Sequence, residues 1–366
     1  MIINSHVHIN PNENCFFYNS YGMKRFLEEM HSTGITMAFP TLNPKLEIFR
    51  CPNDCSFHCV SKEINNNLQN CNCSFQNRHR VCVEEKNGKA MLRCKTCGMV
   101  ILESSIDPLR KYNISLIEMT RPYRAFVKPL LYLLLCPSTL QNEIEFFEKN
   151  YAGEFTGFKL HPWNDQVSVA DFRIQPKDFS DRQVLKHHTV SPTNTILCNL
   201  DTASRINKNV IEAMHNAVKT SQSFTRTFLI HTGMRDVESP ENAIEFAKKN
   251  PEANVVIAHA AGLKENCLKE IALMENVFID CCPAGFMFRS KDSSLENPND
   301  IMKPEDIYYK ALDFLPTSKI LFGTDSPWGN SEEELAIVRN LKVPEKVRNQ
   351  ILFKNALRVY GIIRLE

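Results

Sequence analysis

The chain has 366 residues, with 43 lysines and arginines against 42 aspartates and glutamates, which gives a formal charge of +1. This balance excludes proteins that coat nucleic acids or bind membranes through a polybasic surface. Hydrophobic residues make up 43% of the chain and charged residues 23%, a composition that excludes collagen-like and disordered proteins.

The sequence carries no pattern for export or membrane insertion. Residues 1–6 lack the basic and apolar regions of a signal peptide. The most apolar stretch, residues 130–136, is far shorter than the ~18–20 residues that span a bilayer. The 14 cysteines, in the absence of a leader, are typical of a reducing compartment. We therefore expect a cytoplasmic protein without membrane spans.

Short apolar segments alternate with helical patterns along the chain, as in a parallel sheet with crossover helices. Eight segments are expected as strands: 2–9, 35–42, 130–136, 155–160, 226–230, 255–258, 277–280 and 320–322. Helices are expected over 23–31 and 140–151, after Ser239-Pro240-Glu241, and after the capping-box pattern Ser331-x-x-Glu334. Eight strand and helix units predict one α/β domain over residues 1–366, a (β/α)8 TIM barrel.

Two segments interrupt this alternation. Residues 43–106 follow the second strand and contain eight of the 14 cysteines, whereas residues 163–203 follow the fourth strand and are polar. Insertions at these positions lie over the catalytic face of a barrel, so each is expected to act as a lid or to determine substrate specificity.

Ionisable residues gather at the carboxyl ends of the expected strands, where a barrel builds its active site. His6 and His8 end the first strand, and their spacing of two places both imidazoles on one face. The fourth, fifth, sixth and eighth strands end in Lys159, His231, His259 and Asp325. Each residue alone is explained by an ordinary hydrogen bond or turn, but their convergence in an apolar barrel is costly without a metal or ion pairs.

This pattern resembles the amidohydrolase superfamily, in its amidohydrolase-related branch of metal-dependent TIM-barrel hydrolases and decarboxylases. The run Phe353–Gly361 is similar to the final helix of that family. The resemblance implies a first metal bound by His6, His8, His231 and Asp325. It also implies that His259 binds a second metal or polarises the carbonyl group of the substrate.

Lys159 distinguishes two versions of this site. The run Lys-Leu-His-Pro at 159–162 resembles the Lys-Leu-Tyr-Pro of dihydroorotases, whose lysine is carboxylated and bridges two metals. In the other version one metal is bound, and unmodified Lys159 acts as a cation toward the substrate. The sequence supports both equally, because a lysine modification leaves no trace in it.

Both versions predict an enzyme that uses a metal-bound hydroxide to hydrolyse an amide, ester or lactone of a small molecule. Asp325 is expected to move the proton, and His259 or the metal to stabilise the oxyanion. The expected substrate-binding residues are His161, Arg235 and Arg289, although solvated loop arginines would look the same. Zinc is the expected metal, with manganese, iron and cobalt as alternatives.

The first insertion resembles a zinc-binding module. Cys94-Lys95-Thr96-Cys97-Gly98 is similar to one knuckle of a zinc ribbon, and one or two structural zinc ions would stabilise a segment with little core. The expected ligands are Cys51, Cys55, Cys59, Cys71, Cys73, Cys82, Cys94 and Cys97. The alternatives are an iron–sulfur cluster and unliganded thiols.

Two other functions stay open. One is non-oxidative decarboxylation or hydration at a mononuclear site, which the same family also performs. The other is a catalytically inactive scaffold that binds a partner through the cysteine-rich insertion. Residues 43–106 contain nine basic and six acidic residues, and 9 − 6 gives only +3, so nucleic acid is not an expected partner.

Overall fold

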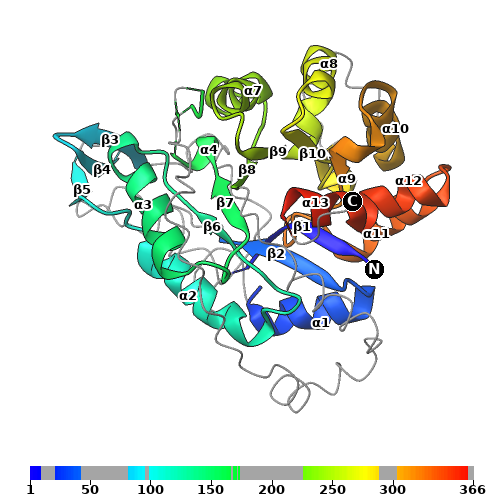
Figure 1. Cartoon of the computed structure of the whole chain (residues 1–366), viewed down its shortest axis with the longest axis horizontal. Helices are drawn as coiled ribbons and strands as arrows, with labels where there is room; N and C mark the ends of the chain where they lie inside the picture. The colour runs from blue at the N-terminus through cyan, green and yellow to red at the C-terminus, as the bar shows by residue number, and fades with distance from the viewer. Residues whose placement is uncertain are drawn as a thin grey trace, which may run out of the picture.

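The computed structural model describes residues 1–9, 21–42, 81–94, 99–165, 168–170, 172–173, 226–287 and 303–361. At its centre lies a sheet of eight strands in the order β1-β2-β6-β7-β8-β9-β10-β11 (Figure 1). The strands are β1 (Ile3–His8), β2 (Met37–Thr41), β6 (Leu130–Tyr132), β7 (Gly157–Leu160), β8 (Thr227–Ile230), β9 (Asn254–Ile257), β10 (Val277–Asp280) and β11 (Ile320–Leu321). Neighbouring strands pair in parallel, and each overlaps one of the eight expected segments.

The sheet closes on itself between β1 and the chain that follows β11. The backbone N–H of Ser5 donates to the carbonyl of Phe322 at 3.0 Å, and that of His8 donates to the carbonyl of Ser326 at 2.8 Å. Val7 and Ser326 add an isolated parallel bridge. The predicted TIM barrel is therefore confirmed, and the carboxyl ends of its strands meet at one mouth.

Alternate residues of the strands pack on opposite sides of the sheet. In β8, Phe228 and Ile230 belong to the larger apolar cluster, which includes helix residues such as Phe246. Leu229 belongs to a smaller cluster that fills the barrel together with Val256. Strands that are covered on both faces consist of nearly continuous apolar runs, which is why their positions could be predicted from the sequence.

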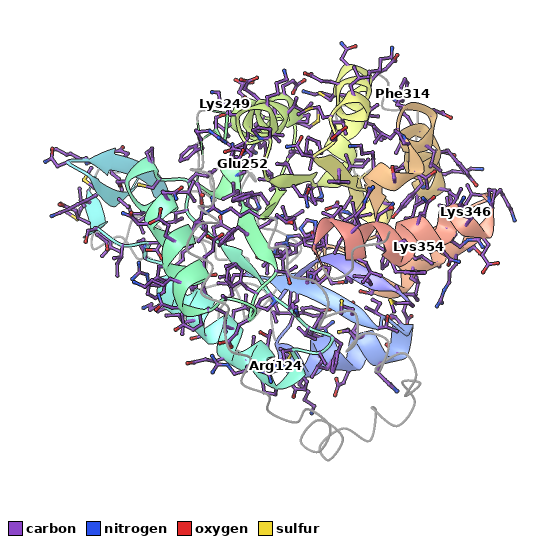
Figure 2. All side chains as sticks on the ribbon, in the orientation of Figure 1. Arg124, Lys249, Glu252, Phe314, Lys346 and Lys354 are labelled. Atoms are coloured by element: carbon purple, nitrogen blue, oxygen red, sulfur yellow. The ribbon has the colours of Figure 1, made fainter. Side chains whose placement is uncertain are left out.

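Helices surround the barrel (Figure 1). They are α1 (Met23–Thr33), α2 (Arg110–Thr120), α3 (Pro137–Asn150), α4 (Pro162–Asp165), α7 (Pro240–Lys249), α8 (Glu265–Leu273), α9 (Ala284–Met287), α10 (Pro304–Phe314), α11 (Ser331–Asn340), α12 (Glu345–Asn349) and α13 (Asn355–Val359). Short 3₁₀ turns are Arg121–Tyr123, Asp236–Glu238, His259–Leu263 and Thr317–Lys319, and Gln350–Lys354 is a π-helical turn. Charged side chains such as Lys346 and Glu252 are exposed, and Lys346 lies at the edge of the molecule in Figure 2.

The final helix closes the amino-terminal end of the barrel. The carbonyl of Val359 accepts hydrogen bonds from Thr227 Oγ1 at 2.8 Å and from Asn254 Nδ2 at 2.7 Å, at the starts of β8 and β9. Tyr360 packs against Phe39 with ring centroids 4.3 Å apart. With this end closed, the open mouth lies at the opposite end of the strands.

The two predicted helix starts have different outcomes. Ser239 is the N-cap of α7, with Pro240 in the first turn, as expected. The capping box at Ser331 is wrong by one residue, because the N-cap of α11 is Asn330, whose side chain accepts from the backbone N–H of Glu333. The Ser331 hydroxyl instead hydrogen-bonds Ser326 and Glu29, whereas the Glu334 carboxylate accepts from two backbone N–H groups outside α11.

The part of the first insertion that the structure describes is a separate antiparallel sheet of β3 (Val81–Lys86), β4 (Lys89–Cys94) and β5 (Val100–Ser104). Asn87 and Gly88 form the tight turn between β3 and β4 with φ of +54° and +72°. Positive φ at both positions is typical of a type I′ hairpin, for which Asn-Gly is the strongest sequence signal.

Most of the expected zinc ligands lie outside the described residues, namely Cys51, Cys55, Cys59, Cys71, Cys73 and Cys97. Cys82 and Cys94 are placed on β3 and β4 by their backbones only. Most of residues 163–203 also lie outside the described part. Structural zinc and the division into a barrel with two insertions therefore stay predictions. Among the described helices, none has the length and apolar character needed to span a bilayer.

Candidate metal centre

An irregularity in β1 turns two histidines toward the barrel interior. Ile3 packs in the inner cluster and Val7 in the outer one, although residues four apart in a regular strand share a face. The pairing of β1 with β2 shifts register between Asn4 and Val7, as in a β-bulge. Bulges beside active sites commonly redirect side chains, and here His6 and His8 become neighbours with their Nε2 atoms 3.2 Å apart.

Asp325 reaches the same point from the chain after β11. Its backbone N–H donates to the carbonyl of His6 at 2.8 Å, and its Oδ1 lies 3.2 Å from His6 Nε2 and 3.1 Å from His8 Nε2. Gly323 permits this close approach, since a Cβ there would lie 2.7 Å from Cys282 Sγ and 3.0 Å from His6 Cβ.

The outer nitrogens of both histidines fix their tautomers. His8 Nδ1 lies 3.2 Å from the carbonyl oxygen of Leu42, which can only accept, so Nδ1 carries the hydrogen. His6 Nδ1 lies 3.0 Å from Asp280 Oδ2 and donates to it in the same way. Burial lowers the pKa of His6 far below its usual value, which keeps this imidazole neutral. In the neutral form of each ring, Nε2 therefore presents a lone pair.

Three acceptor atoms thus converge without a hydrogen between them. His6 Nε2, His8 Nε2 and Asp325 Oδ1 are all buried and could hold a metal ion. Two ligand atoms at ~2.1 Å from a tetrahedral metal are about 3.4 Å apart, close to the separations found here. A set of two imidazoles and one carboxylate suits zinc, manganese, iron or cobalt, so the residues present fit such an ion.

Lys159, at the end of β7, is completely buried and supplies a positive group beside these acceptors. Its Nζ lies 3.0 Å from His6 Nε2 and donates to that lone pair. Burial lowers the pKa of Lys159 to about 8. A lysine with a lowered pKa is more nucleophilic at neutral pH, and carboxylation requires the neutral amine. Both versions of the site, with and without the modification, stay predictions.

His231 and His259 form a second pair of facing nitrogens. His259 Nδ1 donates to the carbonyl of Cys282 at 2.6 Å, and its Nε2 lies 2.9 Å from His231 Nδ1. His231 Nε2 lies 3.2 Å from Glu238 Oε2. Burial lowers the pKa of His231 to about 4, so the ring is neutral and has a single N–H. When that hydrogen points to Glu238, two lone pairs face each other here as well.

The second pair lies beside the first cluster, since the rings of His6 and His259 have centroids 5.5 Å apart. His161 stacks on His231 with centroids 3.8 Å apart, so it forms a wall of the site. Arg235 is exposed in the connection after β8, and Arg289 lies outside the described residues. The two arginines therefore stay untested as substrate-binding residues.

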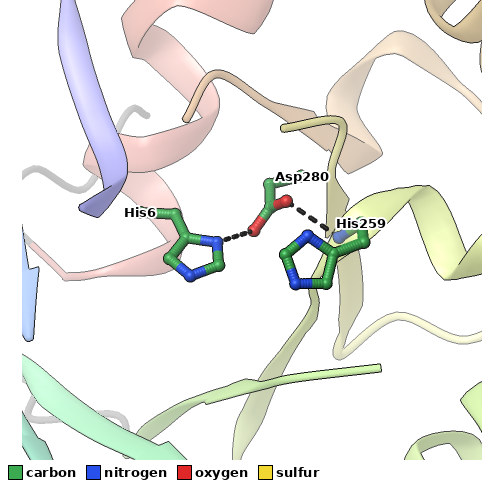
Figure 3. A group of neighbouring side chains, drawn as sticks. All are labelled: His6, His259 and Asp280. Carbon is green, nitrogen blue, oxygen red and sulfur yellow. Dashed lines mark hydrogen bonds and ion pairs between the residues drawn. The ribbon is translucent and has the colours of Figure 1, made fainter. Parts of the chain in front are cut away.

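Asp280 and Glu238, which hold the outer nitrogens of His6 and His231, are not among the residues predicted from the sequence. Asp280, drawn with His6 and His259 in Figure 3, ends β10. The rule that singled out the other strand ends would have found it. Glu238 lies in a 3₁₀ turn after β8, and nothing in its sequence spacing points to His231.

Comparison with known proteins supports the expected resemblance. Residues 223–362 match the family model described as Amidohydrolase, a segment that includes His231, His259 and Asp325. No curated protein sequence matches the chain.

Solved structures share the fold over nearly the whole chain. A Staphylococcus aureus protein assigned as an amidohydrolase is 10% identical, with 98% of this chain and 99% of that chain covered and a TM-score of 0.52. The dihydroxybenzoic acid decarboxylase from Polaromonas sp. JS666, solved with manganese and 2-nitroresorcinol, is 12% identical, with 99% and 97% covered and a TM-score of 0.51. The 5-carboxyvanillate decarboxylase from Sphingomonas paucimobilis is 11% identical, with 98% of both chains covered and a TM-score of 0.50.

At such identities the likeness shows a shared fold. Because the match to the family model contains three of the expected site residues, the resemblance to the amidohydrolase superfamily is confirmed for residues 223–362.

Proposed function

We propose that the protein is a metal-dependent hydrolase that cleaves an amide, ester or lactone of a small molecule. The observation that carries this proposal is the convergence of His6 Nε2, His8 Nε2 and Asp325 Oδ1, which lie within 3.2 Å of one another in a buried site. Lys159 donates to His6 Nε2, but three acceptors this close still repel one another, and a bound cation removes that cost.

His6, His8 and Asp325 would hold the first ion, with His231 as a further ligand. The tautomer of His259 favours a role as a metal ligand over a role in polarising the carbonyl group of the substrate. Its Nδ1–H is engaged by the carbonyl of Cys282, so the neutral ring offers only a lone pair at Nε2. A bound divalent metal lowers the pKa of a coordinated water and polarises the carbonyl group of the substrate.

The side chains then perform the proton transfers. Asp325 accepts the proton of the attacking water and returns it to the leaving group. Unmodified Lys159 would stabilise the developing oxyanion, whereas carboxylated Lys159 would act as a bridging ligand. His161, stacked on His231, would line the substrate side of the pocket.

A second candidate is non-oxidative decarboxylation. It is favoured by the whole-length fold similarity to two proteins described as decarboxylases of aromatic acids. The same residues would serve it, with Asp325 first taking up a proton from solvent and then passing it to the carbon that loses CO2.

Metal content tests the proposal first. The wild-type protein and the His6→Ala/His8→Ala double variant are purified side by side, and metal per chain is measured by elemental analysis. We expect a loss of about one equivalent from a mononuclear site, or about two from a binuclear site bridged by Lys159. Equal metal content in both proteins would contradict the proposal and favour the inactive scaffold, because all remaining metal would belong to the cysteines.

A substrate panel separates the two candidate reactions. Esters, lactones and amides are followed by proton release, and hydroxybenzoic acids by release of CO2. Turnover of the first group that is lost in the double variant supports hydrolysis. CO2 release without any hydrolysed product would replace hydrolysis by decarboxylation.

A further inference from the structure

The chain after β9 adopts a backbone conformation that needs outside support. Residues His259 to Leu263 all have positive φ, between +52° and +62°, and only Gly262 among them is free of the resulting steric strain. Such a conformation persists where surrounding contacts determine it, and it is frequent at functional sites. The first residue of this left-handed turn is His259, whose ring belongs to the candidate metal centre.

Asp280 supplies a contact at the start of this turn. Its Oδ1 accepts from the backbone N–H of His259 at 3.0 Å, and the Cys282 thiol lies 3.3 Å from the same oxygen. Its Oδ2 accepts from His6 Nδ1 at 3.0 Å (Figure 3). Asp280 is completely buried. One carboxylate therefore holds the ring of one site histidine and the backbone of another.

Although His6, His259 and Asp280 lie close enough to hold a metal between them, the hydrogen bonds assign Asp280 another role. Both of its oxygens already face N–H donors. A metal on Oδ2 would have to displace the hydrogen of His6 Nδ1, whereas the Nε2 lone pair of the same ring already faces Asp325. The carboxylate orients the ligand from behind, an arrangement that also raises the basicity of the imidazole.

We propose that Asp280 is a positioning residue of the metal centre, which fixes the tautomer of His6 and the place of His259 and thereby sets metal affinity. The inference rests on the proposed metal-dependent function. It extends that function to a residue that touches neither the metal nor the substrate.

The variant Asp280→Asn separates this role from simple packing, because an amide offers one acceptor and one donor of nearly the same shape. If its oxygen stays on the N–H of His259, its NH2 faces His6 Nδ1 and favours the tautomer with hydrogen on Nε2. That tautomer blocks the ligand atom. If the amide is flipped, two N–H groups face each other at His259 and the turn loses its support.

Asp107 provides the matched control. It is as buried as Asp280, and its carboxylate accepts from two backbone N–H groups, those of Leu109 at 2.7 Å and Leu134 at 3.0 Å. The structure places it in the connection before α2, with no contact to the site histidines among the described residues. Asp107→Asn therefore perturbs a buried carboxylate without touching the metal centre.

The experiment is a titration of the metal-free full-length protein with Mn²⁺, followed by electron paramagnetic resonance. Manganese is chosen because imidazole and carboxylate ligands accept it, whereas thiolates prefer zinc, so the cysteines interfere least. We expect Asp280→Asn to weaken Mn²⁺ binding by about tenfold to a hundredfold, which is the usual effect of losing an outer hydrogen bond to a ligand. Asp107→Asn should bind Mn²⁺ as the wild type does, even where its melting temperature falls as much.

The second readout is the tautomer of His6 in the metal-free protein, from the ¹⁵N shifts of its imidazole ring. We expect hydrogen on Nδ1 in the wild type and on Nε2, or an exchanging mixture, in Asp280→Asn. Wild-type affinity in Asp280→Asn, equal weakening in both variants, or a wild-type His6 protonated on Nε2 would each overturn the inference. The last result needs no variant, so it decides even where Asp280→Asn fails to fold. If no Mn²⁺ binding depends on His6 and His8, the proposed function is contradicted. The tautomer of His6 in the wild-type protein would still test the role of Asp280.

Discussion

Two parts of the barrel differ in whether their buried acceptor atoms receive hydrogen bonds from the protein. Near β6, the carboxylates are matched by donors from the protein itself: Asp107 accepts from two backbone N–H groups, and Asp165 accepts from a backbone N–H and from the Tyr132 hydroxyl. At the ends of β1 and β11, His6, His8 and Asp325 instead direct three acceptor atoms at one another.

The difference shows how to distinguish a supporting carboxylate from a functional one. Burial alone does not, since both groups are buried to a similar extent. The informative property is whether the donors come from the chain, because an unmatched buried acceptor destabilises the fold unless something else binds it.

The largest effect is expected for Asp325→Asn, on turnover. Removal of the proton-transferring carboxylate should lower turnover by about 10²–10⁴-fold on any substrate that the panel identifies. The metal-free variant should melt no lower than the wild type, because the new amide N–H can donate to an Nε2 lone pair. Turnover close to that of the wild type would exclude Asp325 from the proton transfer.

His8→Ala should remove one of the proposed metal ligands and leave His6 Nε2 and Asp325 Oδ1 facing each other. We expect the dissociation constant for Mn²⁺ to rise by more than about a hundredfold, beyond the usual effect of losing an outer contact. His31→Ala is the control, because His31 is an exposed histidine at the end of α1. Equal affinity in the two variants would remove His8 from the metal centre.

Tyr132→Phe tests the matched region. The change removes the hydroxyl that donates to Asp165 at 3.0 Å and leaves a buried oxygen with one donor fewer. The free energy of unfolding, measured in urea, should fall by about 1–3 kcal/mol, with Mn²⁺ affinity unchanged. A change in affinity without a change in stability would mean that this region belongs to the metal centre after all.

The pH dependence of stability gives the most specific effect. Burial raises the pKa of Asp165 to about 8, against the opposing influence of Leu135 N–H and the Tyr132 hydroxyl. The unfolded chain loses this proton near pH 4, so between pH ~4 and ~8 only the folded protein retains it, and stability falls as the pH rises. Asp165→Asn should remove up to one proton from this dependence, a slope of about 1.4 kcal/mol per pH unit. Urea midpoints measured across this interval check it, and an unchanged slope would assign the proton to another group.

The barrel could be predicted from the sequence because its strands are buried on both faces and read as apolar runs bounded by turns. The candidate site could be predicted for a related reason, since His6, Lys159 and Asp325 stand where such runs end. Asp280 also stands where such a run ends, although the family pattern assigns no role to the seventh strand.

Other features could not be predicted from local patterns. Glu238 contacts His231 because of how the turn after β8 folds in the tertiary structure. The change in which side chains of β1 point into the barrel arises from a register shift in its pairing with β2. Ser331 fits a capping box, yet its hydroxyl is engaged by Glu29 on another helix. The Asn87-Gly88 hairpin, in contrast, carries a local signal, since Asn-Gly favours the positive φ that both residues adopt.

The left-handed turn after β9 also bears on how this protein would respond to directed evolution. At Ala260 and Ala261 the chain holds side chains in a conformation that costs roughly 1–2 kcal/mol per residue, which glycine avoids. Glycine is normally a destabilising replacement for alanine, but here a library screened for thermostability should return it. Such variants would keep the ring of His259 in place while reducing the demand on Asp280, and so would offer a more robust starting point for redesigning the substrate pocket.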